Sequence, residues 1–406
     1  MDESGPFRRH WRDITSRFLH LGATSFGGPA ILGIMQVELQ EKRQWVSRER
    51  FLEGLSLVNM LPGATATQLG IFLGYARGGW WGGLLAGACF VLPGFVVMVL
   101  LTLAYAALGV TPLMRGALYG LGPVVLGIFL VAVYRLGRSA VSAIPQAIIL
   151  AAAALTSIFT PLGVGAILLL AGGVGLLLFH SAKLGVVVVG VLASAFVVLP
   201  LVWPMSSSGP AIGLATQATP GLADIGAYFF KVGALTVGGG LTMIAFMQDQ
   251  VVDQFHWLTP PEFVDGLALG QFTPGPLLML AAYVGYKVAG IAGALVAAAA
   301  AFLPSFILML ALLPVFDRVR KYTWTRAVLR GMAPAVVGIL AVSLFRLAPY
   351  ALPDAFAIAI FAATVTCLFI WRASTIKLMI AGAAVGVFRS RLASLFGAGA
   401  ARGLGL

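Results

Sequence analysis

Asn59-Met60-Leu61-Pro62-Gly63-Ala64 is the central stretch of this chain, and Gln271-Phe272-Thr273-Pro274-Gly275-Pro276 repeats its pattern. Each lies in the middle of an apolar run that is long enough to reach bilayer depth. A helix cannot pass smoothly through Pro-Gly, because proline removes a backbone donor and clashes with the preceding turn. Backbone groups freed inside a membrane must find partners in protein, water or a bound ion. A helix break that recurs in two halves therefore predicts the binding site of a transporter.

The composition predicts an all-α polytopic membrane protein. The chain has 406 residues, of which 60% are hydrophobic and 10% charged, and its mean hydropathy is +0.99. The net charge of +12 arises from Lys and Arg at the ends of apolar runs, where they set topology, so it indicates no nucleic-acid partner. The two cysteines, Cys89 and Cys367, lie inside apolar runs without metal spacing. The polar, Arg-rich start gives no sign of a cleaved signal peptide. We expect no metal and no cofactor.

The second half of the chain repeats the first. Phe18-x-x-x-Gly22 with Gly27-Gly28 matches Phe229-x-x-x-Gly233 with Gly238-Gly239 at an offset of 211 residues. Between 115–135 and 326–346, 9 of 21 positions are identical. We therefore expect an N-terminal repeat over 1–203, a linker rich in Ser, Gly, Pro and Thr over 204–222, and a C-terminal repeat over 223–406.

Basic residues change places between the repeats. The loop Glu38–Arg50 carries four Lys or Arg, whereas its counterpart Asp249–Glu262 carries none. The turn Gly109–Met114 has no basic residue, whereas its counterpart Phe316–Thr325 has three. Because basic loops stay in the cytoplasm, the two repeats should have inverted topology, with their broken Pro-Gly helices meeting near the bilayer midplane. We place both termini in the cytoplasm and the linker outside.

Two arrangements of the broken runs remain open. Residues 18–36 and 51–76 either enter and leave on the cytoplasmic side as hairpins, followed by five full spans, or cross the membrane completely. The number of crossings between Ala351 and Phe388 is also open. Ser47 and Thr259 are the expected N-caps of the helices that precede the two Pro-Gly breaks.

The motifs resemble those of the chromate ion transporter (CHR) family. The resemblance rests on Phe26-Gly27-Gly28-Pro29, the segment around Trp45, Leu61-Pro62-Gly63 and Thr273-Pro274-Gly275-Pro276, and it covers nearly the whole chain. It implies a bacterial inner-membrane protein that exports chromate or a similar tetrahedral oxyanion such as sulfate. Oppositely oriented halves also fit that family. The repeat pattern is specific for the family but not for the substrate.

The breaks supply the groups that an oxyanion needs. A helix N-terminus offers free N–H donors and the positive end of a dipole. Thr65, Thr67 and Gln68 follow the first break, whereas apolar residues follow the second, so we expect an asymmetric site. The alternatives are that the Pro-Gly pairs are simple kinks and that the glycine runs only permit tight packing. The candidate substrate-binding residues are Gly27, Gly28, Asn59, Pro62, Gly63, Thr65, Thr67, Gln68, Lys231, Gly238, Gly239, Gln271, Thr273, Pro274 and Gly275.

Ionisable residues inside the broken runs are candidates for charge balance, coupling or gating. Lys231 and His20 share one repeat position, where a lysine could balance one charge of a dianion. The alternative is that both side chains reach the nearest interface. The coupling or gating candidates are His20, Glu53, Asp265, Arg115 and Arg326. For Glu53 and Asp265 the simpler interpretation is helix-dipole stabilisation, and for the arginines it is membrane anchoring.

No catalytic constellation is evident. The four histidines are scattered, and no P-loop is present, which excludes ATP as the energy source. A secondary transporter driven by membrane potential, proton exchange or both is the leading hypothesis. The alternatives are an anion channel and a membrane-embedded enzyme that acts on a lipid. The sequence leaves the oligomeric state open, with a homodimer as one option.

Overall fold

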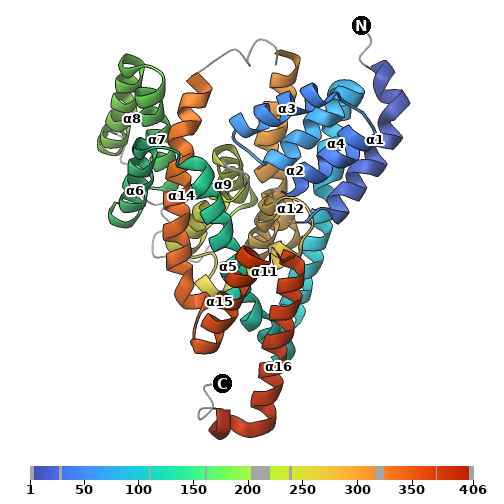
Figure 1. The fold of residues 1–406 in the computed structure, drawn as a ribbon, viewed down its shortest axis with the longest axis vertical. Coiled ribbons are helices and arrows are strands. Elements are labelled where there is room, and N and C mark those ends of the chain that lie inside the picture. Colours follow the sequence, from blue (N-terminus) through green and yellow to red (C-terminus); the bar gives the residue numbers. More distant parts are fainter. Residues whose placement is uncertain are drawn as a thin grey trace.

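The computed structural model describes residues 4–26, 30–108, 111–160, 162–202, 220–236, 240–315, 324–371 and 373–401. These residues form helices and connecting turns without a strand (Figure 1). Within them, four helices are long and apolar enough to cross a membrane: Thr65–Leu108, Pro112–Ala140, Leu277–Leu312 and Ala327–Ala351. The chain is therefore an all-α, multi-pass membrane protein, as its composition predicts.

The first half begins with two broken segments and continues with longer helices. The broken segments contain α1 (Ser4–Thr24), α2 (Ala30–Met35), the π-helix η1 (Gln36–Lys42), α3 (Arg48–Met60) and the start of α4 (Thr65–Leu108). Helix α4 bends at Gly79, which has a φ of 65°. The helices that follow are α5 (Pro112–Ala140), α6 (Ile144–Phe159), α7 (Val164–Phe179) and α8 (Ala182–Val202).

The second half has the same order of elements. Its broken segments contain α9 (Leu222–Leu235), α10 (Thr242–Met247), the π-helix η2 (Gln248–Gln254), α11 (Pro260–Phe272), the 3₁₀ turn η3 (Leu277–Met279) and the start of α12 (Leu280–Leu312). Helix α12 bends at Gly290, which has a φ of 62°. The short turn η4 (Leu313–Val315), α14 (Trp324–Ala351), α15 (Ala355–Ile370) and α16 (Thr375–Ala401) complete the fold. The bends and the π-helices thus recur at equivalent positions.

The expected caps are present. The Ser47 side chain accepts a hydrogen bond from the Arg50 N–H at the start of α3. At the start of α11, Thr259 accepts from the Glu262 N–H, and Glu262 accepts from the Thr259 N–H. This reciprocal pair is a capping box, which satisfies two N–H groups that the helix itself leaves free. Local sequence therefore fixes where both helices begin.

Each broken segment folds back as a hairpin. In α3 and the first part of α4, the Arg50 guanidinium lies 5.7 Å from the centre of the Phe72 ring, and Gly54 packs against the same ring. In α11 and the first part of α12, the Tyr283 hydroxyl donates to the Glu262 carbonyl over 2.9 Å. Residues 51–76 thus fold back on themselves, in the arrangement that the hairpin alternative predicts.

Equivalent long helices of the two halves run antiparallel. Along α4 and α12, Gly83 lies beside Leu310 and Gly87 beside Phe306, so residue numbers rise on one helix as they fall on the other. Helices α5 and α14 behave in the same way, with Gly122 beside Ala351 and Gly137 beside Val337. The two halves are therefore related by an approximate two-fold axis that is perpendicular to these helices.

The last two helices carry the chain to the end of the helical body that lies far from the start of α1 (Figure 1). Two helices, α15 and α16, follow α14, and α16 runs antiparallel to α5, with Gly382 beside Gly120 and Gly386 beside Gly116. Ser390 of α16 donates a hydrogen bond to the Pro112 carbonyl at the start of α5, and α16 continues beyond this point, at the far end of the helical body from the start of α1 (Figure 1). Arg389 on α16 pairs with Asp354, the N-cap of α15, over 2.9 Å. The cytoplasmic location of both termini stays a prediction, because it depends on which helices cross the membrane.

Candidate functional site

The four hairpins meet at their tips, and the described residues of these tips are Ser25 and Phe26 (tip 1), 61–64 (tip 2), Thr236, Gly240 and Leu241 (tip 3), and 273–276 (tip 4). The Gly63 N–H of tip 2 donates to the Thr236 carbonyl of tip 3 over 2.6 Å. The Gly275 N–H of tip 4 donates to the Ser25 carbonyl of tip 1 over 2.8 Å. Each bond joins one half of the chain to the other, and the two bonds are equivalent by the repeat. The two Pro-Gly stretches therefore lie together in the interior.

Glycine is required at both donor positions. Helix α3 ends at Met60 and α4 begins at Thr65, so tip 2 lies between two helices. Gly63 has a φ of 123°, and Gly275 has a φ of 94°. A side chain strains the backbone at such angles, whereas glycine adopts them without a steric penalty. The Pro-Gly sequence thus turns the chain and aims its N–H at the other half.

Two side chains fix tip 2. The Ala64 N–H donates to the hydroxyl of Ser305 over 2.9 Å, and Ser305 is fully buried. The Gln68 amide nitrogen donates to the Pro62 carbonyl over 2.6 Å. These bonds satisfy backbone groups that the helix break releases, as a membrane interior demands.

Tip 4 is held differently. The repeat counterpart of Ser305 is Gly94, which packs so closely against the Pro274 carbonyl that an added Cβ would lie 2.5 Å from it. The Thr273 hydroxyl donates back to the Leu269 carbonyl of its own helix over 3.0 Å. The site is therefore asymmetric, with polar side chains at tip 2 and backbone packing at tip 4.

A cavity of about 220 Å³ lies among the tips. The N-termini of two long helical segments, Thr65–Leu108 and Leu277–Leu312, reach it. Asn59 and Thr65 supply its polar side chains, and no described residue that lines it is charged. Its lining consists of Ile31, Leu32, Val58, Asn59, Leu61, Ala64, Thr65, Ala66, Leu136, Gly240, Pro276, Leu277 and Leu278.

Buried polar atoms without partners lie at tip 1 and on the first turn of α4. Thr67 Oγ1, Gln68 Oε1 and Ser25 Oγ are buried, and none has a hydrogen-bond partner among the described residues. Each of these residues has an exposed fraction of 0%. Buried polar atoms normally have partners, so atoms that lack one mark a place for a ligand or water. The arrangement can hold a small anion through helix N-terminal dipoles, each equivalent to about half a positive charge, and the Ser25 and Thr67 hydroxyls, whereas Gln68 Oε1 can only accept.

Most of the predicted substrate residues lie at the tips. Asn59 and Thr65 line the cavity, and seven others lie in tips 2 and 4 or on the first turn of α4 without lining it: Pro62, Gly63, Thr67, Gln68, Thr273, Pro274 and Gly275. Gln271 is half-buried near the end of α11. Gly27, Gly28, Gly238 and Gly239 lie outside the described residues.

The ionisable candidates lie elsewhere. Lys231 and His20 are exposed and do not line the cavity. Glu53 pairs with Arg50 over 2.9 Å at the outer end of its hairpin. Asp265 accepts from the Tyr105 hydroxyl over 3.0 Å and, with Arg115, lines a separate cavity of about 240 Å³. The side chain of Arg326 lies outside the described part of the chain.

Sequence reasoning missed three residues at the tips. Ser25 and Thr236 provide the carbonyls that join the halves, and Ser305 caps Ala64. Ser25 and Thr236 occupy equivalent positions just before the glycine runs, so the repeat contained a signal for them. Ser305 follows the repeated Pro304, but its counterpart is glycine, so the repeat gave no signal for its hydroxyl.

Comparison with known proteins agrees with the resemblance. The sequence model of the chromate transporter family matches residues 12–178 and 223–387, one region in each half. A chromate transport protein of Cupriavidus metallidurans is 35% identical over 377 residues, which cover 92% of each chain. A probable chromate transport protein of Synechococcus elongatus is 36% identical over 333 residues, which cover 81% of this chain and 82% of the relative.

A chromate transport protein of Pseudomonas aeruginosa is 30% identical over 384 residues, which cover 91% of this chain and 90% of the relative. No solved structure matches the chain. The family match extends over most of both halves, including the hairpins whose tips surround the cavity. The chain therefore belongs to the chromate transporter family.

Proposed function

We propose that this protein is a secondary transporter that exports chromate, or a similar tetrahedral oxyanion such as sulfate, across the bacterial inner membrane. The observation that carries the proposal is the pair of hydrogen bonds from Gly63 to Thr236 and from Gly275 to Ser25. They bring four helix breaks from two halves around one cavity, which is where transporters with broken helices bind ions. We infer the substrate from the relatives that are named chromate transport proteins.

The oxyanion binds between the N-termini of α4 and of the η3–α12 segment. Free N–H groups of these first turns, with the side chains of Asn59 and Thr65, face its oxygens. Tip 2 contributes more than tip 4, because apolar residues follow tip 4 at Leu277 and Leu278. We also assign Gly27, Gly28, Gly238 and Gly239, which lie outside the described residues, to this site.

Export of an anion from an inside-negative cell is electrically downhill. A dianion gains about 4.6 kcal/mol per 100 mV, which is twice the value for a single charge. Membrane potential, proton exchange or both therefore supply the energy. Uptake of the dianion would have to overcome the same electrical free energy.

We also infer that the repeats, 1–203 and 223–406, are inverted in the membrane and joined outside by 204–222. The antiparallel packing of α4 with α12 and of α5 with α14 supports this inference. If these helices cross the bilayer, their approximate two-fold axis lies in the membrane plane. The basic loop 38–50 then faces the cytoplasm, and the acidic segment 249–262 faces outward.

Cysteine labelling tests this topology. In a variant without Cys89 and Cys367, single cysteines are placed at Gln44 and Gln254, which are both exposed. We expect an impermeant thiol reagent to label the cysteine at 254 in intact cells and the cysteine at 44 only after permeabilisation. Labelling of both positions from the same side would refute inverted repeats.

Chromate accumulation by inside-out vesicles tests the function. Vesicles that contain the protein should accumulate chromate with saturation when the membrane is energised, and host cells should gain chromate resistance. Flux that rises linearly with concentration would favour the anion channel. Vesicles that behave like vesicles without the protein would refute chromate transport.

A further inference from the structure

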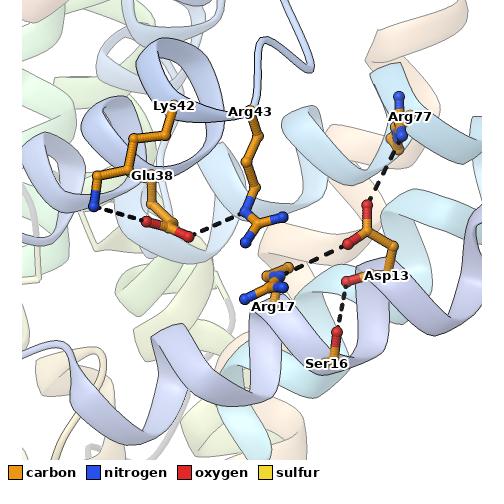
Figure 2. Close-up of polar contacts among 7 residues, drawn as sticks. All are labelled: Asp13, Ser16, Arg17, Glu38, Lys42, Arg43 and Arg77. Atoms are coloured by element: carbon orange, nitrogen blue, oxygen red, sulfur yellow. Dashed lines mark hydrogen bonds and ion pairs between the residues drawn. The ribbon is translucent and has the colours of Figure 1, made fainter.

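A charged cluster occupies the outer ends of the first two hairpins. It consists of Asp13 and Arg17 on α1, Glu38 and Lys42 on η1, Arg43 just after η1, and Arg77 on α4, and we call it the basic cluster (Figure 2). The Asp13 carboxylate lies 3.7 Å from Arg17 and 3.8 Å from Arg77. The Glu38 carboxylate lies 3.0 Å from Arg43 and 3.4 Å from Lys42. Two carboxylates thus face four cations, which leaves a net charge of +2.

The cluster also has unused donors. The Nε–H groups of Arg17 and Arg77 are buried and have no hydrogen-bond partner among the described residues. Glu38 is already engaged, and the hydrogen bond from Arg43, supported by Lys42, lowers its pKa although burial opposes the shift. Asp13 is shared between two arginines at distances too long for hydrogen bonds. Surplus positive charge and free N–H donors are the features that bind an oxyanion.

The second half loses every base of this cluster and carries more acids in its place. Asp13, Arg17 and Arg77 correspond to Asp224, Tyr228 and Val288 at an offset of 211 residues. The π-helices η1 and η2 match at an offset of 212, so Glu38, Lys42 and Arg43 correspond to Gln250, Gln254 and Phe255. Helix η2 instead carries Asp249 and Asp253. Arg346 pairs with Asp253 over 3.2 Å, so this acidic counterpart, which consists of Asp224, Asp249 and Asp253, has a net charge of −2. Burial is the main cause that raises the pKa of Asp249, and the neighbouring Asp253 carboxylate raises it further.

Two hairpin arms connect the basic cluster to the cavity. The first part of α4 begins at Thr65 in the cavity wall and reaches Arg77, which is about 18 Å at 1.5 Å per residue. The α2–η1 arm begins near Ile31 in the same wall and ends at Lys42. The equivalent arms of the second half lead to the acidic counterpart. The two ends of the pseudo-symmetric transporter are therefore alike in fold and opposite in charge.

We propose that the basic cluster captures the oxyanion on the cytoplasmic side and loads the transporter, and that its acidic counterpart favours release on the opposite side. This inference rests on the proposed chromate transport and on the inverted topology. A charged surface raises the local concentration of an opposite charge and speeds association by about 10- to 1,000-fold, depending on ionic strength. The difference in charge between the two ends thus favours transport in one direction, which the pseudo-symmetric fold alone does not.

Arg77→Gln and Arg17→Gln test the proposal in inside-out vesicles, which expose the cytoplasmic side. At low ionic strength each variant should raise the KM for chromate about threefold to tenfold with an unchanged maximal rate, because association is weakened and the cavity is intact. At about 1 M salt, where screening acts within about 3 Å, the difference from wild type should disappear. Asp13→Asn should lower the KM, because it adds net positive charge.

Two variants separate charge from packing. Arg77→Lys keeps the charge and should retain most of the wild-type KM. Arg138→Gln removes an exposed charge from the end of α5, outside the basic cluster, and should change little. Labelling of a cysteine at Gln254 shows that each variant keeps its orientation.

Three results would overturn the proposal. They are a lowered maximal rate with an unchanged KM, a KM increase that salt does not remove, and an equal effect of Arg138→Gln. Failure of the wild-type protein to accumulate chromate would instead refute the proposed function, so the two failures can be distinguished.

Discussion

Gly63→Ala should lower chromate uptake by about tenfold or more, because the new side chain meets both strain and occupied space. The φ of 123° costs a non-glycine residue about 1–3 kcal/mol. An added Cβ would overlap the Ser305 hydroxyl and lie 2.6 Å from the Gln68 amide nitrogen. Tip 2 must therefore move, which breaks the bonds that fix Ala64 and Pro62. Uptake into inside-out vesicles, at matched protein amounts, measures the loss.

Gly270→Ala is the matched control for this prediction. Gly270 lies on α11 close to tip 4, but no atom lies within 4 Å of its added Cβ. The control should therefore transport at a rate near that of wild type. Pro62→Ala together with Gly63→Ala should collapse transport as well, since it lets α3 and α4 join into one helix. Normal export by a well-expressed Gly63→Ala protein would show that tip 2 is only a kink.

Gly233→Ala should destabilise the protein by about 1–3 kcal/mol, the usual cost of overpacking a core. Gly233 lies where α9 crosses α12, and an added Cβ would overlap the backbone carbonyl of Ala301. Backbone atoms cannot turn aside as a flexible side chain can, so α9 must move away. That shift would also displace Thr236, which accepts the bond from Gly63. The thermal midpoint in detergent and the rate of chromate uptake should both fall.

Gly226→Ala serves as the control on the same helix. The nearest atom to its added Cβ is a methyl carbon of Val296 at 3.3 Å, which can give way. A thermal midpoint close to wild type is expected for this control. If Gly233→Ala were equally stable, the close approach of α9 and α12 would not contribute to stability.

The local features of the fold were predictable from the sequence. Ser47 and Thr259 cap the helices that the sequence assigns to them, because a cap depends on only a few neighbouring residues. The duplication was evident because glycine and proline tolerate few replacements where the backbone turns or helices touch. Apolar runs indicated the membrane because backbone groups in lipid must be satisfied within helices.

The placement of charges in the interior was less predictable. Lys231 shares a repeat position with His20, but both residues are exposed and neither lines the cavity. A helical position determines which face a residue occupies only once the neighbouring helices are known. The sequence could therefore identify these residues as unusual without saying where they point.

The sequence by itself determined the helices, their caps, the duplication and the glycines at the breaks, since each depends on local dihedral preference or hydrophobic pattern. Only the tertiary structure decided that tip 2 bonds to tip 3 and tip 4 to tip 1, and that Ser305 completes tip 2. Only it placed the end of α16 opposite the start of α1. These features join residues more than 150 positions apart, and they exist because the equivalent helices of the two halves pack antiparallel. No local sequence pattern contains that packing.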